Sequence, residues 1–275
     1  MKNIVLILFV SFISFQAYSQ RKPKIKGNKN VIEVREDLES FSAIELSDDL
    51  DIVLQKSSQE GYALELDDNL IDVLKFNVDG GILKISSFYN ITSKKKLNIT
   101  IFFQELNSVK MLNGKISMKD VISTDRLQVY TSGTSRLELN ATADIIDITM
   151  EEISSGDFNL ASDSLNITLK DRIDVKLYST GANNSIYMYK NATAKMEGTT
   201  DILMAKLYGS SSLKASDLQS TDVLLISEDS SDAEIRALSS FQLSSKGASK
   251  TKLYGDAKIT ILDFLDTSRL DKEKN

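Results

Sequence analysis

The chain has 275 residues, with 33 Lys and Arg against 39 Asp and Glu, and it contains neither cysteine nor histidine. This composition excludes disulfides, Ser-His-Asp and Cys-His catalytic groups, and zinc or iron sites built from Cys or His ligands. The formal net charge of −6 opposes contact with phosphate backbones, so we expect no nucleic-acid partner.

The first segment, residues 1–19, has the pattern of a secretory signal peptide. Lys2 gives it a positive start, residues 4–15 are almost entirely apolar, and residues 17–19 (AYS) form a small-x-small cleavage site before Gln20. A membrane anchor is the alternative, but this apolar run is shorter than the about 20 residues that a spanning helix needs. We therefore expect export to the periplasm, the outer-membrane surface or the medium, with no transmembrane segment in the mature chain.

The next segment, residues 20–37, begins with a strongly basic stretch. Residues 20–30 carry five Lys and Arg, no acidic residue and the chain's single proline, Pro23. Such a composition is typical of a solvated terminal arm, and we expect this one to be flexible. Contact of the arm with an anionic lipid or glycan is the alternative.

Four short stretches that alternate polar and apolar residues predict strands in the first part of the domain. A hairpin turn is predicted at residues 79–81 (DGG). Because the spacing of these stretches is irregular, we expect an irregular β cap that covers one end of the domain. The four stretches are residues 41–46, 50–54, 62–66 and 83–85.

From residue 127 onward, a pair of apolar residues separated by one position returns every 17 to 21 residues. A second alternating stretch lies between successive pairs, so one repeat consists of strand, turn, strand and turn. A period of this length is the signature of a stacked solenoid, in which a single coil cannot bury its own apolar side. The sequence therefore predicts one all-β solenoid domain over residues 38–270, followed by a polar tail at 271–275. The eight pairs are Leu127/Val129, Ile146/Ile148, Leu165/Ile167, Ile186/Met188, Leu203/Ala205, Leu224/Ile226, Phe241/Leu243 and Ile259/Ile261.

An acidic or amide residue precedes six of these eight pairs by two positions. In a solenoid, such residues would repeat about 4.8 Å apart at one turn of successive coils. We favour side chains that accept local backbone N–H bonds and face water, as Asx motifs do. A ladder of calcium ions is the alternative, although the sequence lacks the nine-residue Gly and Asp spacing of calcium-binding β-rolls. The six residues are Asp125, Asp144, Asp163, Asn184, Asp201 and Asp222.

The triplet Lys-Leu-Tyr occurs three times, at residues 176–178, 206–208 and 252–254. Strand alternation places each leucine inside and each lysine outside, with the tyrosine at a bend. Exposed tyrosines can stack on sugar rings, but packing at the corners of the coils is the favoured interpretation. The unequal spacing does not place the three tyrosines in one column.

Three stretches share a recurring pattern: residues 41–46 followed by 51–54, residues 127–139 (LQVYTSGTSRLEL) and residues 246–256 (KGASKTKLYGD). Together they resemble the auto-transporter adhesin head GIN domains, which are exported proteins common in Bacteroidetes. The resemblance covers residues 38–270 and implies a right-handed parallel β-helix-like fold, an extracytoplasmic location and no established activity. The chain departs from the family's Ser-Gly turn pattern where Glu152, Arg172 and Asp229 replace glycine.

No residue of the sequence is assigned a catalytic, cofactor-binding or metal-binding role, and no cofactor is expected. The favoured function is that of a non-enzymatic, adhesin-like binding or structural module of the cell surface, with an unidentified surface glycan or protein as its partner. The alternative is a β-helix enzyme that acts on glycans, either a polysaccharide lyase or a glycosidase with paired carboxylates. The repeats carry no long insertion that would wall a catalytic cleft, which favours the binding module.

Overall fold

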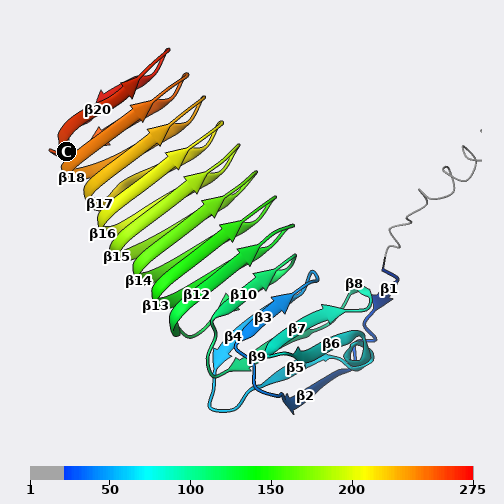
Figure 1. Cartoon of the computed structure of the whole chain (residues 1–275). Helices are drawn as coiled ribbons and strands as arrows, with labels where there is room; N and C mark the ends of the chain where they lie inside the picture. Colours follow the sequence, from blue (N-terminus) through cyan, green and yellow to red (C-terminus); the bar gives the residue numbers. More distant parts are fainter. Residues whose placement is uncertain (1–21, 275) are drawn as a thin grey trace, which may run out of the picture.

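The computed structural model describes residues 22–274, and nearly all of its regular structure is β-strand (Figure 1). The predicted signal peptide, residues 1–19, lies outside these described residues. Within them, no helix has both the length and the apolar character required to cross a membrane.

A β-solenoid of about nine turns forms most of the molecule. Each full coil is one long strand, bent near its middle, that pairs in parallel with the strands of the coils before and after it. A turn of four residues leads into the next coil. The strands are β12 (Ile122–Thr131), β13 (Arg136–Met150), β14 (Ser155–Leu169), β15 (Asp174–Met188), β16 (Thr193–Leu207), β17 (Ser212–Ser227) and β18 (Asp232–Ser245).

The bend divides every coil between two walls that face each other across the core. The second half of each long strand forms wall A, which contains the pair Leu127/Val129, and the first half forms wall B, which contains Leu137 and Leu139. At the N-terminal side, short separate strands continue both walls in the same parallel register. Wall A continues through β10 (Ser108–Met111), β3 (Ala43–Leu46) and β7 (Ile82–Ser87), and wall B through β11 (Lys115–Met118), β4 (Asp51–Lys56) and β9 (Leu97–Phe103).

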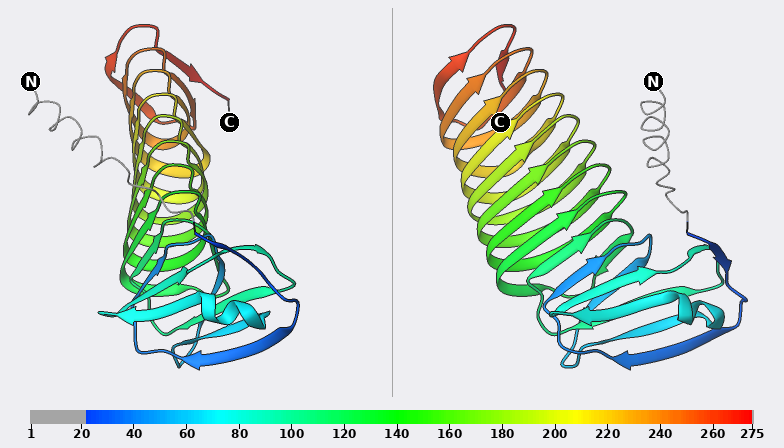
Figure 2. Two further views of the ribbon diagram at one scale, coloured as in Figure 1. Left: turned by 90° about the vertical axis from the view of Figure 1, so that its right-hand side faces the viewer. Right: turned by 45° about the vertical axis from the view of Figure 1, so that its right-hand side comes forward.

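Antiparallel pairing begins at this end and forms the cap. Strand β9 pairs with β5, which pairs with β2, and β7 pairs with β6. Figure 2 shows this cap across one end of the stacked coils. The all-β solenoid with an irregular N-terminal cap is therefore confirmed. The cap elements are β1 (Lys24–Lys26), β2 (Val31–Asp37), β5 (Gly61–Asp67), η1 (Asp68–Val73), β6 (Leu74–Asp79) and β8 (Asn90–Ser93).

The basic segment predicted to be a flexible arm, residues 20–37, contains strands β1 and β2 where the structure describes it. The carboxylate of the buried Asp67 helps to hold this segment in a regular conformation. It accepts backbone N–H bonds from Lys29 at 3.1 Å, Lys95 at 3.1 Å and Lys96 at 3.2 Å, and so joins the segment to the cap.

The last coil, at the opposite end, consists of β20 (Lys258–Phe264) on wall A and β21 (Arg269–Lys272) on wall B. Strand β19 (Lys250–Tyr254) precedes them on wall B. Part of the predicted polar tail, residues 271–272, therefore belongs to a strand.

The predicted apolar pairs occupy the core in most coils, and the ladder corrects two of them. Leu203 lies beside Asn184 and Val223, which places those two residues, and not Ile186 and Leu224, at the first position of the pair. Leu224 and Ile226 lie on the outer side of wall A, while Val223 and Leu225 are buried. The alternation of 17 and 21 residues between pairs arises from these two misplaced assignments, because the true period is nearly constant.

Asn184 is a polar residue in an apolar column, with 1% of its surface exposed. Its Nδ2 lies 3.1 Å from Oγ of Ser179, which projects from the bend of the same coil and is also fully buried. Pairing with a hydroxyl offsets the cost of burying the amide. The apolar-pair pattern missed this position because its partner is recognisable only in the folded coil.

The turns that follow wall A share one backbone feature, a residue with positive φ at the same place in each coil. Glycine occupies it in some coils, as Gly133 does with φ 63°, and non-glycine residues occupy it in others. The glycine replacements predicted at Glu152 and Asp229 lie at this position, but that at Arg172 does not, because Asp171 takes it. The full column is Gly133, Glu152, Asp171, Lys190, Gly209, Asp229, Gly247 and Asp266.

Candidate functional site

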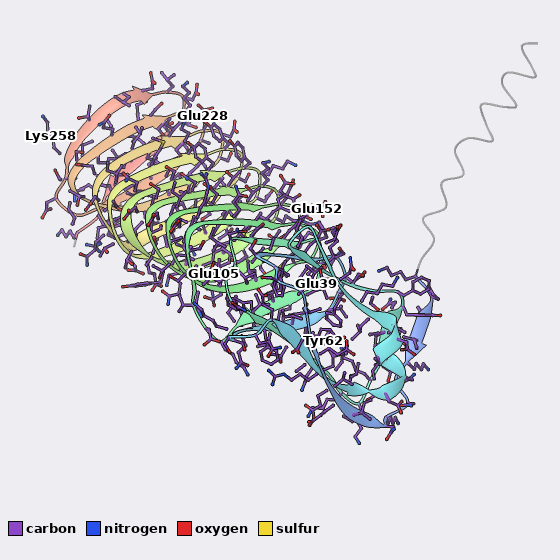
Figure 3. The ribbon with its side chains drawn as sticks, turned by 60° about the horizontal axis from the view of Figure 1, so that its bottom comes forward. Glu39, Tyr62, Glu105, Glu152, Glu228 and Lys258 are labelled. Carbon is purple, nitrogen blue, oxygen red and sulfur yellow. The ribbon has the colours of Figure 1, made fainter. Side chains whose placement is uncertain are left out.

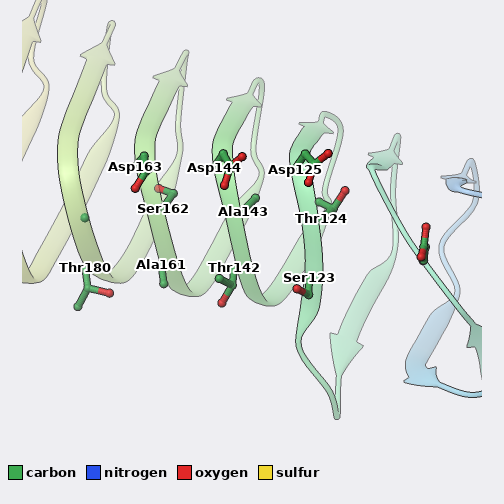
Figure 4. A pocket seen from close by; sticks show the side chains of 12 residues that line it. Ser123, Thr124, Asp125, Thr142, Ala143, Asp144, Ala161, Ser162, Asp163 and Thr180 are labelled. Atoms are coloured by element: carbon green, nitrogen blue, oxygen red, sulfur yellow. The ribbon is translucent and has the colours of Figure 1, made fainter.

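An open hollow of about 820 Å³ runs across four successive coils at the bend between the two walls. Asp125, Asp144 and Asp163 line it along one side, and Glu105 lies at its N-terminal end. Figure 4 shows the three aspartates at equivalent places on neighbouring strands. We call this hollow the acidic groove.

The local backbone explains why these carboxylates project together. Thr124 pairs with Ala143, and Arg126 pairs with Ile145, so the ladder passes over Asp125 and its neighbour Asp144. The same omission recurs one coil later, at Asp144 and Asp163. An unpaired residue at a bend is free to direct its side chain outward, away from the core.

The ladder retains four of the six residues in the predicted acidic column. Ala182 interrupts the column, because it lies at the position beside Asp201. The flanking pairs show this alignment: Gly181 pairs with Thr200, and Asn183 pairs with Ile202. Asn184 is in the core, and Asp222 pairs with Ile202 on wall A. Three contiguous aspartates therefore form the groove, and Asp201 stands apart beyond Ala182.

The three groove aspartates are solvent-exposed, and none of their carboxylates accepts a hydrogen bond or an ion pair within the described residues. These three side chains face water as predicted, but the predicted backbone N–H bonds of Asx motifs are not formed. Like charges at about 4.8 Å repel by roughly 1 kcal/mol in water. On wall A, by contrast, the charge of an aspartate is balanced by a cation: Asp147 lies 2.7 Å from the guanidinium of Arg126.

Ser162 provides a second unpartnered group in the groove. Only 8% of its surface is exposed, and its Oγ is buried without a hydrogen-bond partner in the described structure. A buried hydroxyl without a partner costs about 1–3 kcal/mol. Beside it, Ala143, Ala161 and Gly181 give the groove a floor of small residues that lets a ligand approach the backbone closely.

The groove does not have the donor set of a metal site. Among residues 22–274, no group of three or more Asp and Glu is placed to hold a metal ion together. Calcium takes six to eight oxygen ligands, whereas each groove aspartate belongs to a separate coil. The geometry gives no support to the alternative of a calcium ladder.

The tyrosines of the Lys-Leu-Tyr triplets do not form a common surface. The leucines are buried as predicted, but Tyr178 and Tyr254 lie on wall B while Tyr208 follows wall A. Tyr208 stacks on Tyr189 of the preceding coil, with ring centroids 5.3 Å apart. This contact is packing between successive turns, whereas Tyr178 is exposed on wall B, so the three tyrosines do not share one surface.

Coil-to-coil ion pairs line the turn edge of the molecule, away from the groove; Figure 3 labels Glu152 and Glu228 there. Glu151 accepts bonds from Lys170 Nζ at 2.7 Å and from Tyr130 Oη at 3.0 Å. The hydrogen bond from Lys170, followed by that from Tyr130, holds the pKa of Glu151 below its usual value. The hydrogen bond between Lys170 and Glu151 also raises the pKa of Lys170.

The fold and the groove together define an extended β-solenoid with a polar contact surface and a capped N-terminal end. The chain belongs to the family described as "Putative auto-transporter adhesin, head GIN domain", whose model matches residues 40–161 and again residues 152–257. No curated protein matches the chain.

Several solved structures share this fold. A putative adhesin from Parabacteroides merdae ATCC 43184 superposes with a TM-score of 0.71 at 12% identity, over 91% of this chain and 100% of that one. A putative adhesin from Parabacteroides distasonis ATCC 8503 gives 0.66 at 14% identity, over 90% and 100%. A protein from the same organism, described as a putative lipid binding protein, gives 0.60 at 20% identity, over 90% and 100%. These likenesses support the fold.

Proposed function

We propose that the protein is a non-enzymatic, adhesin-like module of the cell surface that binds a glycan in the acidic groove. The observation that carries this proposal is the row of Asp125, Asp144 and Asp163, which lack partners, beside the buried and unpartnered Oγ of Ser162. Family membership and the structural neighbours described as putative adhesins support the adhesin-like role.

The chemistry of the groove selects the ligand class. Carboxylates only accept hydrogen bonds, so the ligand must be rich in donors, and it must not be anionic. A neutral glycan or an amino-sugar chain meets both conditions, because its hydroxyl or ammonium groups recur along its length as the carboxylates do along the coils. A folded protein partner is less suited, because the groove offers only Ala143 and Ala161 as apolar contacts and no aromatic anchor.

An enzymatic role has less support from the same geometry. A glycosidase needs two carboxyl groups in different environments, one acid and one base or nucleophile. The groove aspartates occupy equivalent exposed places on repeating coils, and the open groove does not exclude water. Such a surface is suited to holding a chain without cleaving it.

A glycan array tests the ligand class. Wild type is compared with the Asp125→Asn/Asp144→Asn/Asp163→Asn variant and with Asp157→Asn, a control on the exposed side of wall B. We expect neutral or amino-sugar glycans to bind wild type and the control, and to lose binding to the triple variant. Binding confined to anionic glycans, or retained in the triple variant, would contradict the proposal.

The bound glycans are then incubated with wild type and followed by reducing-sugar and unsaturated-product assays. We expect no turnover. Product formation that disappears in a folded variant lacking one carboxylate would replace the binding module by the glycan-active enzyme.

An adhesin-like role also requires export, and we propose that the protein leaves the cytoplasm after removal of residues 1–19. The segment itself lies outside the described residues, so the support comes from its sequence pattern. Mass spectrometry of the mature protein is expected to find Gln20 at the N-terminus. A cytosolic protein that retains Met1 would refute export.

A further inference from the structure

Within residues 22–274, nothing covers the solenoid core at the last coil, at the end opposite the cap. Ile259 and Ile261 continue the buried columns of Phe241 and Leu243, yet they are 39% and 46% exposed. Phe264, on the same strand, is 44% exposed. An apolar strand in this position is the kind of surface that monomers normally cover.

The backbone of the last coil is open as well. Within the described residues, β20 pairs with β18 along one edge and with no strand along the other. At the opposite end, the outermost cap strands β2 and β6 are also paired along one edge only within the described residues, but neither exposes a large apolar side chain as β20 does. Figure 3 shows the two ends, with Lys258 on the last coil and Tyr62 in the cap.

We propose that two copies of the chain join tail to tail through antiparallel pairing of β20 with β20. A symmetric contact of this kind uses the same strand on both copies and closes after two. With Thr260 opposite the second copy's Thr260, the inward Ile259 lies opposite the second copy's inward Ile261. The two cores then become one, and the edges of both strands are paired.

The charges of β20 support pairing with a second copy of the same strand. Lys258 and Asp263 lie at opposite ends of the strand, and both face outward, because they pair with Ser240 and Ser244. The register shift between Ile261 and Asp263 is a bulge at Leu262. The bulge brings Asp263 opposite the second copy's Lys258, and antiparallel pairing forms this contact twice.

Other arrangements of two copies lack this complementarity. Parallel stacking of a second β20 would place lysine beside lysine and aspartate beside aspartate, which is unfavourable. Head-to-tail stacking would bring the apolar inner side of β20 against the cap, whose outermost strands β2 and β6 expose no large apolar side chain. The dimer therefore places the two caps at the far ends of a doubled solenoid, with one acidic groove on the coils of each copy.

Light scattering coupled to size exclusion, applied to the purified exported protein, measures the predicted state. We expect twice the mass of one chain for wild type and for the control Lys176→Asp, which lies exposed on wall B. A wild-type protein that remains a single chain at every accessible concentration would overturn the proposal, and so would an open-ended series of larger species.

Charge reversal tests the register. Lys258→Asp and Asp263→Lys are each expected to reduce the mass to that of one chain, because each creates two like-charge contacts. An equimolar mixture of the two variants is expected to restore the double mass, since every contact is again between opposite charges. Failure of the mixture to associate, with both variants folded by circular dichroism, would refute this register.

Discussion

At the residue scale, the positive-φ position of each turn shows how the chain tolerates side chains where glycine is the easiest choice. Where this residue is acidic, its carboxylate accepts the backbone N–H of the corresponding residue in the preceding coil. Glu152 binds Gly133 N at 2.8 Å, Asp229 binds Gly209 N at 2.9 Å, and Asp266 binds Gly247 N at 3.0 Å. The hydrogen bond offsets the strain of the left-handed backbone.

Substitution of Asp229 separates these two effects. Asp229→Ala keeps the positive φ and loses the bond to Gly209, so we expect a loss of about 1 kcal/mol. The melting temperature should fall by about 2–4 °C, as measured by calorimetry. Asp229→Gly loses the same bond but also removes the strain, and should melt close to wild type.

The control for this comparison is Asp232→Ala, an exposed aspartate at the start of β18. It should leave the melting temperature unchanged within the error of the scan. If Asp229→Gly were to melt as low as Asp229→Ala, strain would not be part of the balance at this turn.

At the scale of the element, each coil is a strand whose apolar face is visible in the sequence but whose register is not. Every residue of the stretch 223–226 (VLLI) is apolar. Val223 and Leu225 face the core, whereas Leu224 and Ile226 lie half-buried on the outer side of wall A, with Leu224 beside Met204. Alternation cannot identify the inner face of such a strand. The stacked neighbours, which only the fold provides, decide it.

The acidic groove shows the same limit. Spacing from the apolar pairs predicted the positions of Asp125, Asp144 and Asp163 correctly, because those three coils have a constant length. It failed at Asn184 and Asp222, where the reference pair itself was misplaced. The unpartnered Ser162 carried no sequence signal, since its burial depends on the neighbouring coils.

Ion pairs between coils add a pH dependence at this scale. Because Lys170 and Tyr130 lower the folded-state pKa of Glu151, the unfolded chain binds its proton more readily. The stabilisation is therefore complete above the unfolded value near 4.5 and is lost as the pH falls through the lower folded value. We expect a contribution of at most about 1 kcal/mol, since both partners are partly exposed.

Denaturant unfolding of wild type and Glu151→Gln over the acidic range measures this contribution. The two proteins should differ most near neutral pH, and their stabilities should converge as the pH decreases. A difference that stays constant down to the lowest pH would show that the loss in Glu151→Gln does not arise from the ionised carboxylate.

At the scale of the whole molecule, the solenoid turns a short repeat into a long surface. Each coil buries its apolar residues only through its neighbours, so the chain gains stability by stacking and gains equivalent outer positions at the same time. The cap lies across one end (Figures 1 and 2). The groove extends across four coils on the cap side of the solenoid. This arrangement favours recognition of an extended, repeating ligand over catalysis at one point.

The measurement that tests this account most directly is the affinity of one array-selected glycan for the three single variants Asp125→Asn, Asp144→Asn and Asp163→Asn. If the glycan lies along the groove, each variant should bind about tenfold more weakly than wild type, the loss of one hydrogen bond to a charged group. Asp157→Asn should bind as wild type does. Unchanged affinity in all three groove variants would contradict the acidic groove as the binding site.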